Sequence, residues 1–350
     1  MPCCNSSGVP QHGPELGAYD VGIGTDRIKK VPLPLVQPRT PLRITHPTEP
    51  IHRIVDTPRL IALWHLASLD APTVAVAWAL GFAWPQDSRL SWPVLLILAL
   101  VTWAIYVTDR LLDARAGMGS SARAALRERH FFHWRHRRLL APLAAGAACC
   151  AAGFAVASIS SIVFERGAFV ASASLIYFYA VHARSNHWSA RISARLPSWL
   201  ANKELAAALL ITAGCILPSC ARFHPFTAER SAIWLFWTPC LYLVALMWLN
   251  CWSIATWESA VSEQPNPRAQ SGQPRTIAPL KAALLLASSG MLLALLAPTS
   301  YSHSAALLAC GGASALLLAL LDRLRTQITP LALRATADLV MLTPLFLLLR

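Results

Sequence analysis

Two aspartates near the end of an apolar segment are the first candidates for chemistry. They lie in the sequence Tyr106-Val-Thr-Asp109-Arg110-Leu-Leu-Asp113-Ala-Arg115. Four residues apart on a helix, Asp109 and Asp113 share one face, with about 6 Å between their β carbons. Mg²⁺ commonly binds one or two carboxylates and completes its octahedron with water and phosphate oxygens. The pair therefore indicates a magnesium site for a diphosphate. Alternatively, it is a helix end where the aspartates pair with Arg110 and Arg115.

A second polar motif and a basic connection accompany the pair. Asn250 and Glu258 lie at the end of a later apolar segment, and polar residues inside membrane helices usually mark a site. The connection at 127–138 carries arginines among aromatic residues, as interfacial segments on anionic lipid do. It also holds His130, His133 and His136, whose three-residue spacing could form a metal face, although no acidic or cysteine partner accompanies them.

Nine apolar segments must position these residues. Hydrophobic residues make up 55% of the chain and charged residues 13%, about half the usual charged share of a soluble domain. Each segment approaches the roughly 20 residues that cross a bilayer. We therefore predict an all-α, polytopic membrane bundle of about nine transmembrane helices over residues 58–350. The segments lie near 60–84, 92–113, 139–158, 161–183, 200–219, 231–255, 277–297, 303–321 and 331–349.

The start of the chain differs from the rest. Residues 1–57 are rich in proline and have no apolar period, so we predict a disordered cytoplasmic tail. Asp70 and Pro72 interrupt the first apolar segment. This favours an interfacial stretch from Arg59, followed by a spanning helix that begins near Ala71, with Asp70 as its N-cap and not a buried charge.

Arginine and lysine fall mainly in alternate connections, which predicts the orientation. Their excess at 110–138, 184–203, 268–281 and 323–334 places these loops and the N-terminus in the cytoplasm. We expect the net charge of +13 to interact with membrane lipids or a diphosphate and not with nucleic acid, because the basic residues are spread over short connections between apolar segments rather than gathered in one stripe with aromatic residues. We expect an integral protein of a bacterial inner membrane.

With these motifs in place, the chain resembles the UbiA superfamily of intramembrane prenyltransferases. Members have nine helices, a cytoplasm-facing cavity and two Asp-rich motifs, near the ends of helices two and six, that hold the Mg²⁺ and diphosphate of a prenyl donor. The resemblance covers residues 59–349. The LDAP sequence at 69–72 is similar to the start of the family's first helix, and YFYAVHAR at 177–184 is similar to its Tyr-rich fourth helix.

The resemblance implies a role for each candidate residue. Asp109, Asp113 and Glu258 would bind Mg²⁺, with Asn250 as the remaining catalytic candidate. The basic connection would cap the cavity. The residues that would bind the prenyl diphosphate are Arg110, Arg129, Tyr177, His182 and Lys203. The acceptor would be a lipid-soluble, apolar or aromatic molecule.

The chain also departs from the family pattern. Ile105 and Tyr106 stand where the first motif has Asn and Asp, and Cys251 and Ile254 replace acidic residues of the second. These losses favour an alternative, a non-catalytic UbiA-like protein that binds a lipid or isoprenoid. A transporter is a third interpretation, but the sequence lacks paired broken helices and a charge relay.

Two further charged pairs have local interpretations. Lys203 precedes Glu204, and these two could simply pair with each other. Asp338 follows Arg334 by four residues, which predicts a structural ion pair near the cytoplasmic end of the last helix.

Overall fold

The structure, a computed structural model, describes residues 58–84, 90–118, 126–182, 203–220, 230–262 and 279–349. The predicted tail at 1–57 lies outside them, as do the basic connections at 183–202 and 263–278. The described residues form helices and contain no β-strand. The predicted all-α class is therefore confirmed for this part of the chain.

Eight helical segments in the described part are long and apolar enough to cross a membrane. They correspond to eight of the nine predicted segments. In chain order they are α3 (Trp92–Met118), α5 (Arg137–Ser158), α6 (Ser161–His182), α8 (Lys203–Cys220), α9 (Arg230–Ser262), α10 (Pro279–Leu296), α11 (Ser302–Leu324) with the 3₁₀ turns η4 (Thr299–Tyr301) and η5 (Arg325–Gln327), and α12 (Pro330–Leu339) with η6 (Val340–Leu349).

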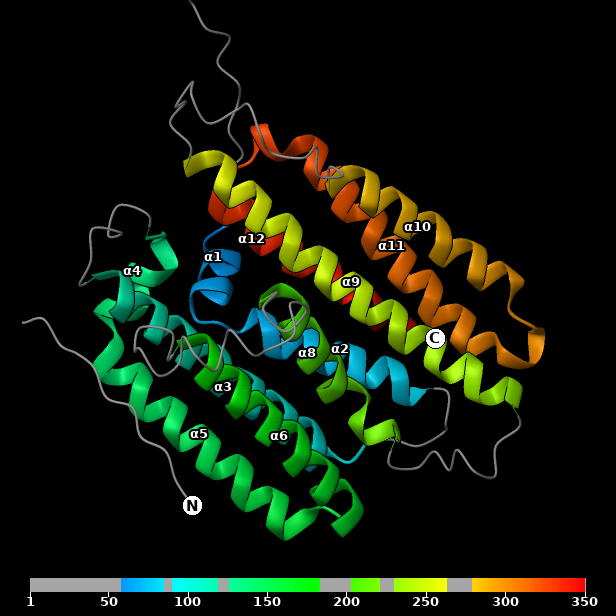
Figure 1. The fold of residues 1–350 in the computed structure, drawn as a ribbon, viewed down its shortest axis with the longest axis horizontal. Helices are drawn as coiled ribbons and strands as arrows, with labels where there is room; N and C mark the ends of the chain where they lie inside the picture. Colours follow the sequence, from blue (N-terminus) through cyan, green and yellow to red (C-terminus); the bar gives the residue numbers. More distant parts are fainter. Residues whose placement is uncertain are drawn as a thin grey trace, which may run out of the picture. The chain divides into compact units, whose positions relative to one another are not determined.

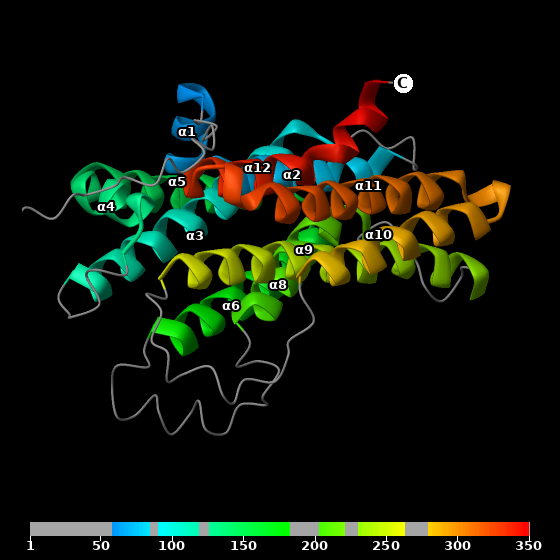
Figure 2. The same ribbon diagram turned by 90° about the horizontal axis from the view of Figure 1, so that it is seen from above.

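The first predicted segment is broken in two. Helices α1 (Arg59–Leu66) and α2 (Asp70–Ala83) meet at an angle of 88°, and they make a ninth span only if counted together. Alone, the 14 residues of α2 extend about 21 Å, less than the roughly 30 Å of a bilayer core. Ser68 makes the turn with a φ of 61°. Figure 2 shows α1 projecting away from α2, so the expected break near Ala71 is confirmed.

The main core joins α2 to the C-terminal helices. Trp78 of α2 is 1% exposed and donates its indole N–H to the carbonyl of Met341 at 3.0 Å. Tyr242 of α9 packs directly against Gly290 of α10 and Gly311 of α11. Small residues of this kind let membrane helices approach closely. This packing fixes α9, which carries two of the predicted site residues, Asn250 and Glu258.

The remaining candidates lie on helices that reach the same end of the bundle. The short helix α4 (Glu128–Arg135) packs against α1 and against α3. In Figure 1 the C-terminal ends of α3 and α9 and the start of α12 gather near α1 and α4. The opposite end holds the turn between α10 and α11. The candidate residues therefore lie at the end of the bundle that holds α1 and α4.

Candidate functional site

A buried polar network lies where α1 turns into α2. Asp70 is fully buried, and its Oδ2 lies 2.6 Å from His65 Nδ1 and 3.4 Å from Arg110 Nη2. Arg110 also donates to the His65 carbonyl at 3.1 Å. The expected N-cap role of Asp70 is therefore wrong, because Leu69 occupies that position and Asp70 is a buried charge. A buried carboxylate persists in a membrane helix when an arginine neutralises it.

This network has a consequence for Arg110. The residue was a candidate for binding the diphosphate, or for pairing with the aspartates of its own helix. It is 2% exposed, its guanidinium is turned toward Asp70, and Tyr106 stacks on it at 4.3 Å. Arg110 therefore holds α2 against α3 rather than lining an accessible surface.

Asp338 of α12 extends the network. Its Oδ1 accepts a hydrogen bond from Asn250 Nδ2 at 3.2 Å, and its Oδ2 lies 3.7 Å from His65 Nδ1. His65, Asp70 and Asp338 bring three potential ligand atoms within 4.8 Å of one another, and no other such group is found among the described residues. Asn250, a catalytic candidate, thus orients a buried carboxylate.

Glu258 of α9 is bound by arginines from two other helices. Arg129 Nη1 donates to its Oε1 at 2.7 Å, and Arg334 of α12 donates to the same oxygen. Arg127 donates to the Glu258 carbonyl at 2.6 Å. The expected Arg334–Asp338 ion pair is therefore wrong, because Arg334 reaches Glu258 instead. Arg129 and Glu258, candidates for the diphosphate and the metal respectively, bind each other and join α4, α9 and α12.

Four predicted residues come together at the ends of α3, α6 and α8. Lys203 Nζ lies 3.6 Å from Asp113 Oδ2, and both side chains are partly exposed. Tyr177 Oη donates to the Lys203 carbonyl at 3.2 Å. Asp109 lies one turn before Asp113 and is close enough to Tyr177 and His130 to interact with them electrostatically. Lys203 therefore forms its ion pair with Asp113 and not with Glu204, the local partner that its sequence position had suggested as an alternative.

The two histidines of α4, His130 and His133, are buried. Burial, with the nearby Arg110 charge, lowers the pKa of both His130 and His133 to about 4. Because the Arg129 carbonyl can only accept, His133 Nδ1 donates to it at 2.7 Å, and Nε2 accepts from Ser68 Oγ at 3.0 Å. His130 Nδ1 accepts from the Arg127 backbone N–H. These bonds engage His130 Nδ1 and both ring nitrogens of His133, and within the described residues the histidines do not converge on a metal face.

The structure thus separates the candidates into two groups. Asp109, Asp113, Tyr177 and Lys203 gather in a partly exposed cluster, which we call the α3–α8 cluster, whereas Arg110, Arg129, Asn250 and Glu258 belong to buried or half-buried ion networks. The side chain of His182 lies outside the described residues. Sequence reasoning missed His65 and Ser68. The one signal for this network in the sequence was Asp70, a carboxylate inside an apolar segment.

The fold defines the class of the protein. Eight apolar helices of spanning length, with a buried arginine–aspartate pair between α3 and α2, are the features of an integral membrane protein. Compared with known proteins, the chain matches no family model, no curated sequence and no solved structure.

Proposed function

We propose that the chain is a UbiA-like intramembrane prenyltransferase, which moves an isoprenoid from a Mg²⁺-bound diphosphate donor to an apolar or aromatic acceptor. The observation that carries the proposal is the α3–α8 cluster, where Lys203 lies 3.6 Å from Asp113. Two carboxylates one turn apart and a lysine from another helix are the groups that a metal–diphosphate complex needs.

The donor set fits Mg²⁺. Asp109 and Asp113 are hard oxygen ligands on one face of α3, and the Asp113 side chain is 36% exposed, which leaves room for water and phosphate oxygens. These two residues would hold the metal. When bound, the metal would draw charge from the diphosphate leaving group as its bond to the prenyl carbon breaks.

The residues of the chain have their own tasks in this proposal. Lys203, released from Asp113, would neutralise a diphosphate oxygen, and its position depends on the Tyr177 hydrogen bond to its carbonyl. The apolar helices around the cluster would exclude water from the reactive prenyl group. Arg110 and Glu258 would act indirectly, by holding α3 and α9 in place.

A second candidate function is a membrane protein that binds a lipid or isoprenoid without catalysis. The observation that favours it is the state of the second motif. Glu258 is bound by Arg129 and Arg334, and Cys251 and Ile254 offer no carboxylate. A family member with an intact second motif would contribute more acidic groups to the metal.

The first test is diphosphate binding by purified protein. We expect geranylgeranyl diphosphate with Mg²⁺ to raise the thermal midpoint, because a ligand of the folded state stabilises it by mass action. Asp109→Asn and Asp113→Asn should each remove that increase while changing the midpoint without ligand by little. Glu165→Gln is the matched control, since it removes an exposed carboxylate from the start of α6 and should bind as the wild type does.

The outcomes separate the two functions. If both aspartate variants bind the diphosphate with unchanged affinity and Mg²⁺ dependence, the transferase proposal is wrong. Binding of the prenyl alcohol as tight as that of the diphosphate, with no Mg²⁺ dependence, would instead support the lipid-binding candidate. Glu258→Gln should weaken diphosphate binding less than either aspartate variant does. It should lower stability more, because Arg129 and Arg334 lose their counter-charge.

A further inference from the structure

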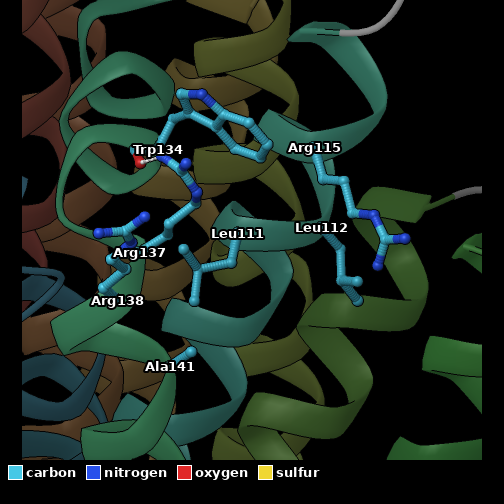
Figure 3. Close-up of a pocket in the computed structure, with 7 residues that line it drawn as sticks. All are labelled: Leu111, Leu112, Arg115, Trp134, Arg137, Arg138 and Ala141. Atoms are coloured by element: carbon cyan, nitrogen blue, oxygen red, sulfur yellow. Dashed lines mark hydrogen bonds between the residues drawn. The ribbon is translucent and has the colours of Figure 1, made fainter.

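A groove of about 310 Å³ lies between α3, α4 and α5, outside the α3–α8 cluster. Figure 3 shows Arg115 on one side of it and Arg137 and Arg138 on the other, with Trp134 and Leu111 between them. The Arg137 guanidinium stacks over the Trp134 ring at 4.3 Å and donates to the Trp134 carbonyl at 2.8 Å. One arginine of the three is thus fixed in place.

The groove faces away from the proposed catalytic residues. Leu111 and Arg115 follow Asp109 and Asp113 by two residues each, and two residues are about 200° around an α-helix. Asp113 pairs with Lys203 of α8, whereas Leu111 and Arg115 line the groove together with residues of α4 and α5. A ligand in the groove would therefore not occupy the diphosphate site.

The charge of the groove is uncompensated. Arg115, Arg137 and Arg138 are exposed, and within the described residues no carboxylate pairs with any of them. They stand at the ends of α3 and α5, two helices that can span a membrane. Between the arginines, the groove is lined by the apolar side chains of Leu111, Leu112 and Ala141.

We propose that this groove binds an anionic phospholipid. The lipid phosphate would lie between Arg115 and Arg138, and its acyl chains would follow the apolar wall formed by Leu111, Leu112 and Ala141. Arginines at the end of a spanning helix attract anionic headgroups, and basic pockets between such helices select them. A soluble phosphate would meet the same arginines but gain nothing from the apolar walls, so the geometry favours the lipid.

The test compares lipids on purified, detergent-solubilised protein. Phosphatidylglycerol should raise the thermal midpoint, and phosphatidylcholine or inorganic phosphate should not. Arg115→Gln combined with Arg138→Gln should require about 30-fold more phosphatidylglycerol, because each arginine near an anionic surface is worth about a factor of five. Arg137 is left intact because it also supports Trp134.

The matched control is Arg59→Gln combined with Arg323→Gln, which removes two other exposed arginines and should bind lipid as the wild type does. Arg115→Lys combined with Arg138→Lys keeps the charge and should retain most of the affinity, which provides a second comparison if the Gln pair folds poorly. Equal stabilisation by the two lipids, or an equal loss in the control, overturns the proposal, and so does equal stabilisation by inorganic phosphate. The experiment contains no diphosphate or Mg²⁺, so its outcome is independent of the proposed transferase.

Discussion

Removing the charge of Asp70 is expected to destabilise the bundle strongly. Asp70 is fully buried and Arg110 is 2% exposed, with 3.4 Å between the carboxylate oxygen and the guanidinium. At an effective dielectric constant of about 20, two unit charges at that distance attract by about 5 kcal/mol. Asp70→Asn keeps the acceptor for the Ala71 N–H but leaves Arg110 buried without its counter-charge. Breaking a buried pair in this way costs about 3–5 kcal/mol.

The expected loss lies at the lower end of this range. Asp338 Oδ2 is 3.7 Å from His65 Nδ1, so a second carboxylate remains in the buried network when the charge of Asp70 is removed. We therefore expect a decrease of about 3 kcal/mol in the free energy of unfolding for Asp70→Asn. The assay is reversible unfolding in mixed micelles of a mild detergent and dodecyl sulfate, followed by circular dichroism.

Two further variants make this prediction specific. Asp70→Asn combined with Arg110→Met should recover much of the stability, because the orphaned charge is removed together with its partner. Asp109→Asn, next to Arg110 on the same helix, should change the free energy of unfolding by less than about 1 kcal/mol. The reasoning fails if Asp70→Asn is as stable as the wild type, or if Arg110→Met adds its own loss to that of Asp70→Asn.

Three other outcomes are expected. Gly311→Ala should cost about 1–3 kcal/mol by overpacking, because its Cβ would lie 2.5 Å from the Tyr242 ring, whereas Gly146→Ala meets nothing and should be neutral in the same assay. The thermal midpoint should fall as the pH is lowered from 6.5 to 4. The pKa of His130 and of His133 is lowered from 6.5 to about 4 in the folded protein, so the unfolded chain binds protons first as the pH falls. A thermal midpoint that does not change over that interval contradicts this prediction. Impermeant labelling in cells should leave a cysteine at position 125 or 270 protected and modify one at position 226, and the reverse pattern overturns the orientation.

The helices were predictable because the information for them is local. An apolar run of about 20 residues reveals a spanning helix without knowledge of its neighbours, and eight described helices match predicted segments. The break before α2 was also readable, from Asp70 and Pro72. The long-range pairings were not predictable from the sequence. Arg110 contacts Asp70, 40 residues earlier, and Lys203 contacts Asp113, 90 residues earlier.

The two wrong predictions share one physical cause. Both used rules for charges on a wet helix surface, where a near neighbour or the helix end is the available partner. Asp70 is buried, so it takes the opposite charge that α3 brings to it, and Arg334 reaches Glu258, 76 residues away, rather than Asp338 on its own helix. In a membrane bundle, a charge in apolar sequence is better paired with another such charge than with its sequence neighbour.

The position of Arg110 between the two candidate ligands explains why stability and ligand binding should separate. Successive residues of a helix point about 100° apart, so α3 presents Asp113 to Lys203, with Asp109 one turn earlier on the same face, while Arg110 enters the buried network with Asp70. The network fixes the rotation of α3 about its axis, and that rotation sets where the two aspartates lie. A change at Asp70 or Arg110 should therefore lower stability first and disturb the aspartates only as a consequence. A change at Asp109 or Asp113 should leave the bundle folded and alter only the binding of Mg²⁺ and the diphosphate.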